Sequence, residues 1–172
     1  MPPIITDWPQ FFTATNLEWK KLLQPDKYKD IVIDSLRFLV EGQRIRLFAF
    51  VIMTNHLHLI WQMKARINRE AVQRDFLKYT AGKIKADLRR HHPNVFEQFF
   101  VDAKDRKYQI WERNALSIEL RSHSVFLQKL NYIHHNPVRA GLCRLPEEYK
   151  YSSARFYESG IDEWGFLTHY ED

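Results

Sequence analysis

Apolar residues in this chain occur in two patterns. Some form short, nearly continuous or alternating runs, and others recur every three to four residues over longer segments. Residues 46–53 form a nearly continuous apolar run, which is typical of a central strand covered by helices. Residues 56–63 follow after two polar residues and carry apolar side chains at alternating positions, as a strand does. Because the connection is so short, the two segments predict an antiparallel hairpin.

Three longer segments have apolar residues at helical spacing. The first covers residues 26–41, with its first residue as a candidate cap and the following glycine as its stop. The second, residues 68–90, has the clearest apolar stripe and is ended by a proline. The third begins after a cap at Ser122 or Ser124 and runs up to the residue before Pro137, because proline disfavours helical backbone in the residue that precedes it.

Two further strands are predicted from aromatic and β-branched residues. One covers residues 11–15, and the other covers residues 108–113 with a continuation at 116–120. The order of elements is strand, helix, strand, strand, helix, strand, helix, which predicts an α+β sandwich with an antiparallel sheet and helices mainly on one face. We expect the other face to be exposed or to bind a partner.

The chain is expected to form one domain over residues 1–172. Its 172 residues are enough for one core, and neither a repeat nor a linker divides them. Residues 146–149 predict a short turn of helix. The tail, residues 159–172, is aromatic and carries no motif, so we expect it to pack on the body.

The composition narrows the class of protein. A hydrophobic fraction of 45% indicates a globular chain, and the net charge of +5 is compatible with a polyanionic partner. The single cysteine excludes an internal disulfide and a cysteine zinc cluster. Neither a signal peptide nor an apolar run long enough to span a bilayer is recognisable, which favours a cytoplasmic, nucleoid-associated protein.

The first candidate for chemistry is the pair His56 and His58. On a strand both imidazoles point to one face, and the intervening leucine points to the other. Two imidazoles at this spacing can chelate one divalent metal if a third ligand is present. The alternative is that they are polar residues on the solvated face of a half-buried strand.

The second candidate is Tyr132, which lies four residues before Asn136 and therefore on the same face of a helix. A tyrosine, whose pKa is about 10, can attack phosphorus when its phenol is brought towards ionisation, and a nearby metal helps. Asn136 offers an oxygen ligand, and His134 and His135 add nitrogen donors. Against this, a helical tyrosine is commonly a core or surface residue, and Asn-Pro commonly ends a helix.

Basic residues form the third feature, because flexible cations on a continuous surface can contact phosphates. A solvated helix face is the alternative for each of them taken singly. The candidate DNA contacts are Arg74, Lys78, Lys83, Lys85, Arg89, Arg90, Arg113 and Arg139.

Four segments in this order resemble the single-tyrosine transposases of insertion sequences, in particular the branch associated with repeated extragenic palindromes (REP). They are residues 54–60 (TNHLHLI), 109–113 (QIWER), 132–142 (YIHHNPVRAGL) and 151–153 (YSS). The first is modestly specific and the third is highly specific. The resemblance covers about residues 8–157.

This resemblance implies a ferredoxin-like α+β sandwich and a metal-dependent transposase acting on single-stranded DNA with a hairpin or palindrome. By resemblance Tyr132 is the nucleophile, and His56, His58 and Asn136 hold Mg²⁺ or Mn²⁺. The family forms a 5′-phosphotyrosine link and frees a 3′-hydroxyl that later reseals the strand. Relatives include dimers that exchange the tyrosine helix and also monomers, so the resemblance is compatible with a homodimer or with a monomer.

Two other functions are compatible with the same residues. A non-catalytic module could bind structured DNA or RNA through the sheet and the basic helix, without cleavage and without a metal. A metal-dependent phosphohydrolase could use water in place of tyrosine, and it would form no link between protein and DNA.

Overall fold

The central hairpin organises a four-stranded sheet in the computed structural model, which describes residues 7–172. The strands are β1 (Gln10–Thr15), β2 (Ile45–Ile52), β3 (His56–Met63) and β4 (Leu116–Glu119). The helices are α1 (Asp26–Glu41), α2 (Arg69–His91), α3 (Pro93–Glu97), α4 (His123–Arg139) and α5 (Ala154–Ser159), with 3-10 turns at Leu17–Trp19 and Pro146–Glu148.

The strand order is β2-β3-β1-β4, and every neighbouring pair is antiparallel. Strands β2 and β3 form the predicted hairpin. In the register of the sheet, Thr13 of β1 lies between His58 of β3 and Leu116 of β4. With α1 after β1 and α2 after β3, this is the β-α-β-β-α-β arrangement of ferredoxin-like folds. The predicted α+β fold class is confirmed.

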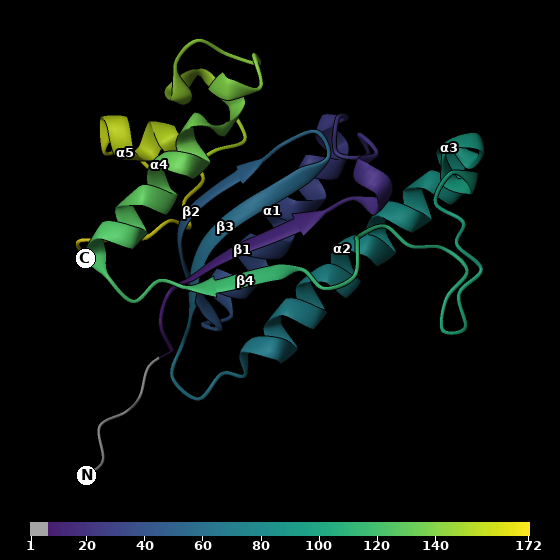
Figure 1. Ribbon diagram of the computed structural model, residues 1–172, viewed down its shortest axis with the longest axis horizontal. Helices are drawn as coiled ribbons and strands as arrows, with labels where there is room; N and C mark the ends of the chain where they lie inside the picture. Colours follow the sequence, from purple (N-terminus) through teal and green to yellow (C-terminus); the bar gives the residue numbers. More distant parts are fainter. Residues whose placement is uncertain (1–6) are drawn as a thin grey trace.

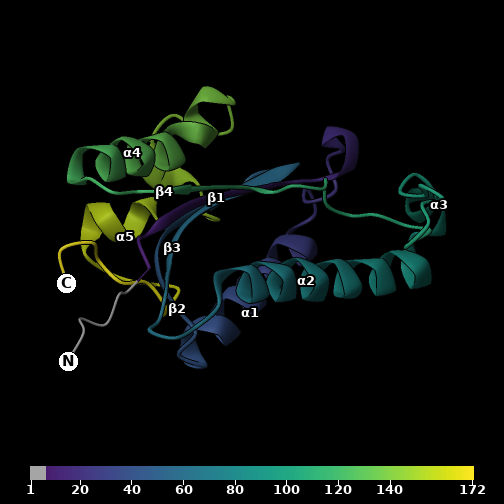
Figure 2. The same cartoon turned by 60° about the horizontal axis from the view of Figure 1, so that its bottom comes forward.

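Helices α1 and α2 lie side by side on one face of the sheet, where the main core is buried (Figures 1 and 2). Phe12, Leu57, Leu59 and Trp61 point into this core from β1 and β3 and are fully buried. Their alternation along each strand turns the residues between them to the other face. The core therefore decides which side chains the second face carries.

Helix α4 packs on that second face, against β2 and β3 (Figure 2). Phe126, Leu130 and Ile133 of α4 form a smaller core with Phe11 of β1 and Ile60 of β3. Helices α1 and α2 do share one face, as expected. The expectation of an exposed or ligand-bound second face applies only to the part that α4 leaves uncovered, near β1 and β4.

Two helix ends differ from the prediction. Asp26 does not cap α1, because it is already the first helical residue and Pro25 occupies the cap position. Helix α4 does not stop before Pro137 but continues to Arg139. The helix ends soon after the proline, where Gly141 adopts a φ of +75° and terminates it.

Residues 108–113 are not a strand, so this part of the prediction was wrong. Tyr108 and Trp111 form only isolated bridges. The Tyr108 ring stacks on Phe96 of α3, and the indole of Trp111 donates to Thr80 of α2 at 3.0 Å. The segment is thus held by its side chains against two helices, and only the part from Leu116 to Glu119 joins the sheet.

The aromatic tail packs on the body, as expected. Trp164 and Phe166 contact Phe50 of β2, while Tyr170 contacts Phe126 of α4. The tail therefore closes over both sides of β2. Within residues 7–172, no helix is long and apolar enough to cross a membrane. The expectation that the N-terminus carries no signal peptide rests partly on residues 1–6, which lie outside the described residues.

Replacing Phe12 by Ala is expected to lower the free energy of unfolding by about 3–5 kcal/mol. Phe12 is fully buried between Trp61 and Phe76, so the change leaves a cavity at the centre of the core. Urea unfolding followed by tryptophan fluorescence measures the change. Phe38→Ala is the control, because Phe38 is 70% exposed and its loss should change stability by about 0.5 kcal/mol or less. Equal losses for both variants would contradict the position of the core.

Candidate active site

Strand β3 presents His56 and His58 on the face that carries α4. Their ring centroids are 4.9 Å apart. His58 is buried beneath Phe11, whose ring stacks on the imidazole at 5.1 Å, while His56 lies near the end of the strand, beside the exposed Trp19. The two imidazoles thus lie together at one end of the sheet, the outer one against solvent.

Each imidazole is oriented through its Nδ1 atom. The Nδ1–H of His56 donates to Oδ1 of Asn55 at 2.7 Å, and a hydrogen bond of 2.8 Å joins Nδ1 of His58 to Oγ1 of Thr13. This arrangement suits rings whose Nε2 atoms serve as ligands, because a second partner on Nδ1 fixes the ring and its tautomer.

The environment also keeps both rings neutral, as metal ligands must be. Burial lowers the pKa of His56. Burial, followed by the charges of His56, Lys129 and Arg139, lowers the pKa of His58 to about 3. Within the described part of the chain, Nε2 of His58 is one of three buried side-chain atoms that lack a hydrogen-bond partner. A buried acceptor of this kind fits a cation, because it is otherwise costly to leave unpaired.

Helix α4 brings Tyr132 to the histidines. Ser122 caps the helix by accepting a hydrogen bond from the backbone N–H of Val125, and Ile133 is buried against the sheet. Tyr132, the neighbour of Ile133, consequently lies at the border of the contact and is 43% exposed. Its ring lies 5.4 Å from that of His58, edge to face. Two segments more than seventy residues apart therefore meet, with the phenol accessible to a ligand.

Two cations flank the tyrosine ring. The guanidinium of Arg139 lies over it at 4.6 Å and donates to the backbone carbonyl of Tyr132 at 2.7 Å. The ammonium of Lys129 lies 5.7 Å from the same ring and 4.8 Å from the ring of Phe11. Positive charge beside the phenol favours a bound phosphate.

Asn136 lies one helical turn after Tyr132 and is half-buried. Among residues 7–172, His, Cys, Asp and Glu form no group of three that could hold a metal. A site here therefore needs a ligand of another kind, and an amide oxygen is one that magnesium and manganese accept. The assignment of Asn136 to the metal stays a prediction, as do the roles of His56, His58 and Tyr132.

His134 and His135, which lie between Tyr132 and Asn136 in the sequence, have different surroundings. Nδ1 of His135 is hydrogen bonded to the carbonyl of Asn131 at 3.0 Å, and the side chain is exposed. His134 is buried, and its Nε2 lies 2.8 Å from Oγ of Ser153. Burial lowers the pKa of His134 to about 4, so it is neutral at physiological pH. These contacts indicate that the two histidines stabilise the helix and do not bind a metal.

The predicted DNA contacts fall into separate groups. Arg74, Lys78, Lys85 and Arg113 line one cleft of about 600 Å³ between α2 and residues 105–115. Lys83 lies over the ring of Tyr79, Arg89 lies over the ring of Phe96, and Arg139 lies at the tyrosine. Arg90 is exposed near the end of α2. Their roles as DNA contacts remain predictions.

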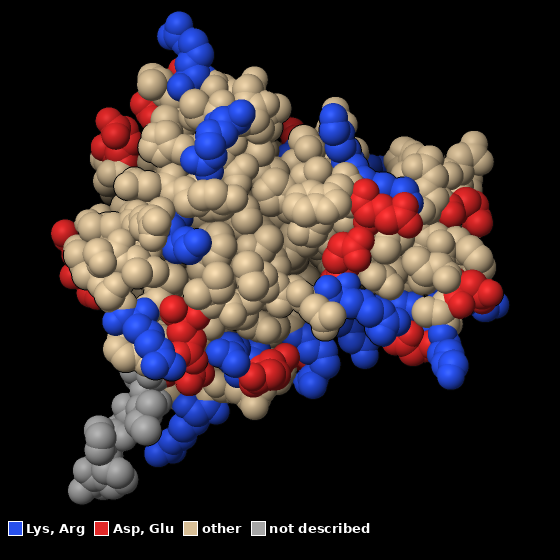
Figure 3. Space-filling model, viewed as in Figure 1, with Lys and Arg blue, Asp and Glu red and all other residues tan. Residues whose placement is uncertain are grey.

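The cleft and the histidines open on different sides of the sheet edge. In Figure 3, which looks onto the α4 side, the centre of the face is largely uncharged, and Lys and Arg gather at the border where α2 emerges. Along this border, Leu116 and Ile118 of β4 are 51% and 38% exposed, on the same face as Thr13 and Phe11. An apolar strip therefore separates the tyrosine from the basic cleft.

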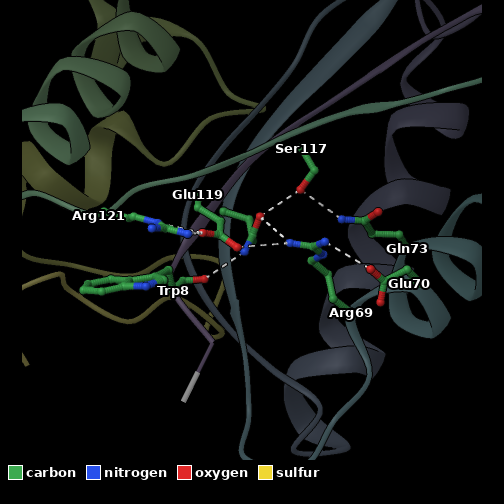
Figure 4. A network of polar contacts seen from close by, with 8 residues as sticks. Trp8, Arg69, Glu70, Gln73, Ser117, Glu119 and Arg121 are labelled. Carbon is green, nitrogen blue, oxygen red and sulfur yellow. Dashed lines mark hydrogen bonds and ion pairs between the residues drawn. The ribbon is translucent and has the colours of Figure 1, made fainter. Parts of the chain in front are cut away.

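A polar network fixes α2 beneath this edge strand (Figure 4). The hydroxyl of Ser117 donates to Oε1 of Gln10 at 3.0 Å and accepts from the amide of Gln73 at 3.1 Å. Arg69 reaches Gln10 at 3.4 Å and the carboxylate of Glu119 at 3.7 Å. The helix that carries most of the cleft is thereby tied to β4 and β1.

The sequence prediction missed Thr13, Asn55 and Lys129. Lys129 lies three residues before Tyr132, so helical spacing could have found it. Asn55 directly precedes His56, but its role depends on a turn. Thr13 could not have been found without the register of β1 against β3.

The chain is similar to known proteins in its sequence and in its fold. None of the protein-family models matches the chain. A curated protein of Haemophilus influenzae, assigned by name only provisionally to the REP-associated tyrosine transposases, is 24% identical over 150 residues, which are 83% of this chain and 81% of that protein. A solved structure of a REP-associated tyrosine transposase bound to a REP hairpin has a TM-score of 0.67 at 17% identity, covering all of this chain and 92% of that one.

The resemblance to REP-associated tyrosine transposases is confirmed. The sequence match spans most of both proteins. The structural match at 17% identity establishes the fold, so it agrees with the strand order described above. The comparisons therefore support the resemblance and the fold. The reaction at Tyr132 depends on the geometry of the site itself.

Replacing Thr13 by Val is expected to weaken Mn²⁺ binding about 10- to 100-fold, the usual cost of losing a partner that orients a histidine ligand. The change removes the hydrogen bond to His58 at nearly constant volume. Isothermal titration calorimetry with Mn²⁺ measures the affinity of each variant for the metal. Thr15→Val is the matched control, because Thr15 lies on the same strand and face but opposite His56, and the structure shows no hydrogen bond from its side chain to either imidazole. Unchanged affinity for Thr13→Val would contradict the orienting role.

Proposed function

We propose that this protein cuts and rejoins single-stranded DNA at hairpin or palindromic sites, with Tyr132 as the nucleophile. The observation that carries the proposal is the position of the Tyr132 ring, 5.4 Å from a buried imidazole whose Nε2 has no partner. A phenol next to an imidazole nitrogen that is free to serve as a ligand is an arrangement suited to phosphoryl transfer.

In the proposed reaction the phenolic oxygen of Tyr132 attacks a phosphorus atom of the strand. The phenol gives up its proton as its oxygen bonds to phosphorus, the bond from phosphorus to the 3′ oxygen breaks, and that oxygen takes up a proton. The phosphate keeps its bond to the 5′ oxygen of the following nucleotide and is now also joined to the oxygen of Tyr132. Attack by a 3′-hydroxyl on the phosphotyrosine reverses the step and reseals the strand. The phosphodiester energy is conserved in the link, so ATP is not needed.

The residues around Tyr132 have distinct parts in this scheme. Lys129 and Arg139 offset the negative charge of the phenolate and of the phosphate. His56, His58 and Asn136 would hold a divalent cation, Mg²⁺ or Mn²⁺, which when bound would polarise a phosphoryl oxygen. The neutral state and free Nε2 of His58 support this ligand set.

The substrate path follows from the surfaces around the site. The exposed Leu116 and Ile118 can lie against unpaired bases, and the cleft beyond them offers five cations against two carboxylates for the phosphates. A relative with the same fold is seen bound to a REP hairpin. We infer that a hairpin-bearing strand crosses β4 between Tyr132 and the cleft.

One chain supplies all the groups that the reaction uses, since Tyr132 meets the histidines of its own chain. A homodimer that exchanges α4 is therefore not required, and the dimer remains a prediction.

Incubation of the protein with a radiolabelled single-stranded hairpin and Mn²⁺ is expected to give a covalent protein–DNA adduct on a denaturing gel. Tyr132→Phe should abolish the adduct, because it removes the attacking oxygen, while hairpin affinity changes less than about twofold. EDTA should also abolish it. Tyr149→Phe is the matched control, since Tyr149 donates its hydroxyl to the backbone carbonyl of Ile52 and not to a side chain of the site.

The alternatives give other results. An adduct that persists in Tyr132→Phe would remove this residue from the role. Tight binding without cleavage, unchanged by EDTA, would identify a non-catalytic binding module. Cleavage without an adduct, unchanged by Tyr132→Phe, would identify a phosphohydrolase that uses water.

Lys78→Ala and Lys85→Ala are each expected to weaken hairpin binding and to reduce the slope of log affinity against log salt by about 1, as the loss of one phosphate contact does. Both lysines line the basic cleft. Fluorescence anisotropy at several salt concentrations measures the slope. Lys150→Ala, beside α5, is the control with the same change of charge. Equal slopes for all three variants would place the DNA elsewhere.

A further inference from the structure

Helix α4 is joined to the rest of the molecule by a buried polar link as well as by its apolar side. Nε2 of His134 lies 2.8 Å from Oγ of Ser153, and both side chains are buried. The apolar contacts of Leu130 and Ile133 hold the helix on the sheet, but such contacts are non-directional. The hydrogen bond has a preferred direction and length, so it selects one rotation and one register of the helix.

Ser153 is in turn fixed to the sheet. The backbone N–H of Phe50 donates to Oγ of Ser153 at 3.0 Å, and the N–H of Ser153 donates to the carbonyl of Phe50 at 3.0 Å. The next residue of β2, Val51, lies opposite His58 in the ladder. A short chain of hydrogen bonds therefore runs from α4 through Ser153 to the strand beside His58.

His134 is well placed to control the tyrosine. Residues two apart on a helix lie about 200° from each other around its axis, so His134 is nearly opposite to Tyr132 and is also two residues from Asn136. A rotation of α4 about its axis that broke the link would carry Tyr132 towards the sheet or away from it. The hydrogen bond of His134 on the buried side of α4 thus sets the distance between the phenol of Tyr132 and the imidazole of His58.

The link also connects two segments that the sequence singled out, through two residues to which the proposed reaction gives no role. His134 belongs to residues 132–142, and Ser153 ends the segment at residues 151–153. They are 19 residues apart, and the structure brings their side chains into contact.

We propose that His134 and Ser153 are positioning residues that hold α4 in the rotation at which Tyr132 faces His58. The inference rests on the proposed function, because it concerns the rate at which Tyr132 attacks DNA. Neither residue contacts the substrate in this proposal.

The test compares His134→Leu with His134→Gln. Leucine keeps the bulk and loses the bond, whereas the amide of glutamine can still donate to Oγ of Ser153. At saturating hairpin DNA with Mn²⁺, adduct formation should slow about 10- to 100-fold in His134→Leu, the size of effect expected when a reacting group is displaced by about 1 Å. Hairpin affinity should stay within about twofold of wild type, and His134→Gln should recover most of the rate.

Ser153→Ala should slow the reaction similarly, and adding His134→Leu to it should cost little more, because both changes break one link. Ser152→Ala is the matched control. Ser152 is equally buried, but its hydroxyl accepts from the N–H of Ala154 within its own turn and not from α4. It should react at the wild-type rate.

A wild-type rate in His134→Leu would overturn the proposal. So would an equal loss of rate and affinity that glutamine does not restore, since this would indicate general damage. Hydrogen exchange separates this inference from the function it rests on. If wild type forms no adduct, the proposed function fails, while faster exchange of α4 amides in His134→Leu, with α1 unchanged, would still support the link and unchanged exchange would overturn it.

Discussion

The alternation of side chains along β3 is the constraint on which both the core and the site depend. Leu57, Leu59 and Trp61 are buried against α1 and α2, and their burial holds the strand in one orientation. His56 and His58 must then point to the opposite face. A slip of one residue would turn the histidines into the core and the apolar residues outward, which the loss of apolar burial opposes. The energy that stabilises the fold thus also orients the candidate ligands.

The second face shows how a small sheet can provide a reactive site and keep it ordered. Helix α4 covers β2 and β3 and leaves Tyr132 at the border between buried and open surface. Burial keeps His58 neutral, while Lys129 and Arg139 add positive charge next to the phenol. The cations beside the phenol suit an anionic phosphate, and a neutral imidazole suits a metal cation.

The basic cleft lies on the other side of β4, so the edge strand is central to how a nucleic acid could engage the protein. Edge strands are exposed to unwanted pairing and are commonly short. Strand β4 has four residues, and the network of Gln10, Gln73 and Ser117 anchors it to α2. A rigid edge keeps the cleft and the tyrosine at a constant separation, which matters for a substrate that contacts both.

Periodicity along the sequence was sufficient to predict β1, β3, α1 and α2 nearly to the residue, because the core selects apolar side chains at the spacing of each element. It failed at residues 108–113, where apolar side chains pack on helices without a ladder, and at Pro137, after which α4 continues for two more residues. Motif order identified His56, His58 and Tyr132 as candidates. Only the tertiary structure showed the hydrogen bonds of Thr13 to His58 and of Ser153 to His134, and the packing of α4 on the second face. These contacts depend on strand register and helix packing between segments far apart in the chain.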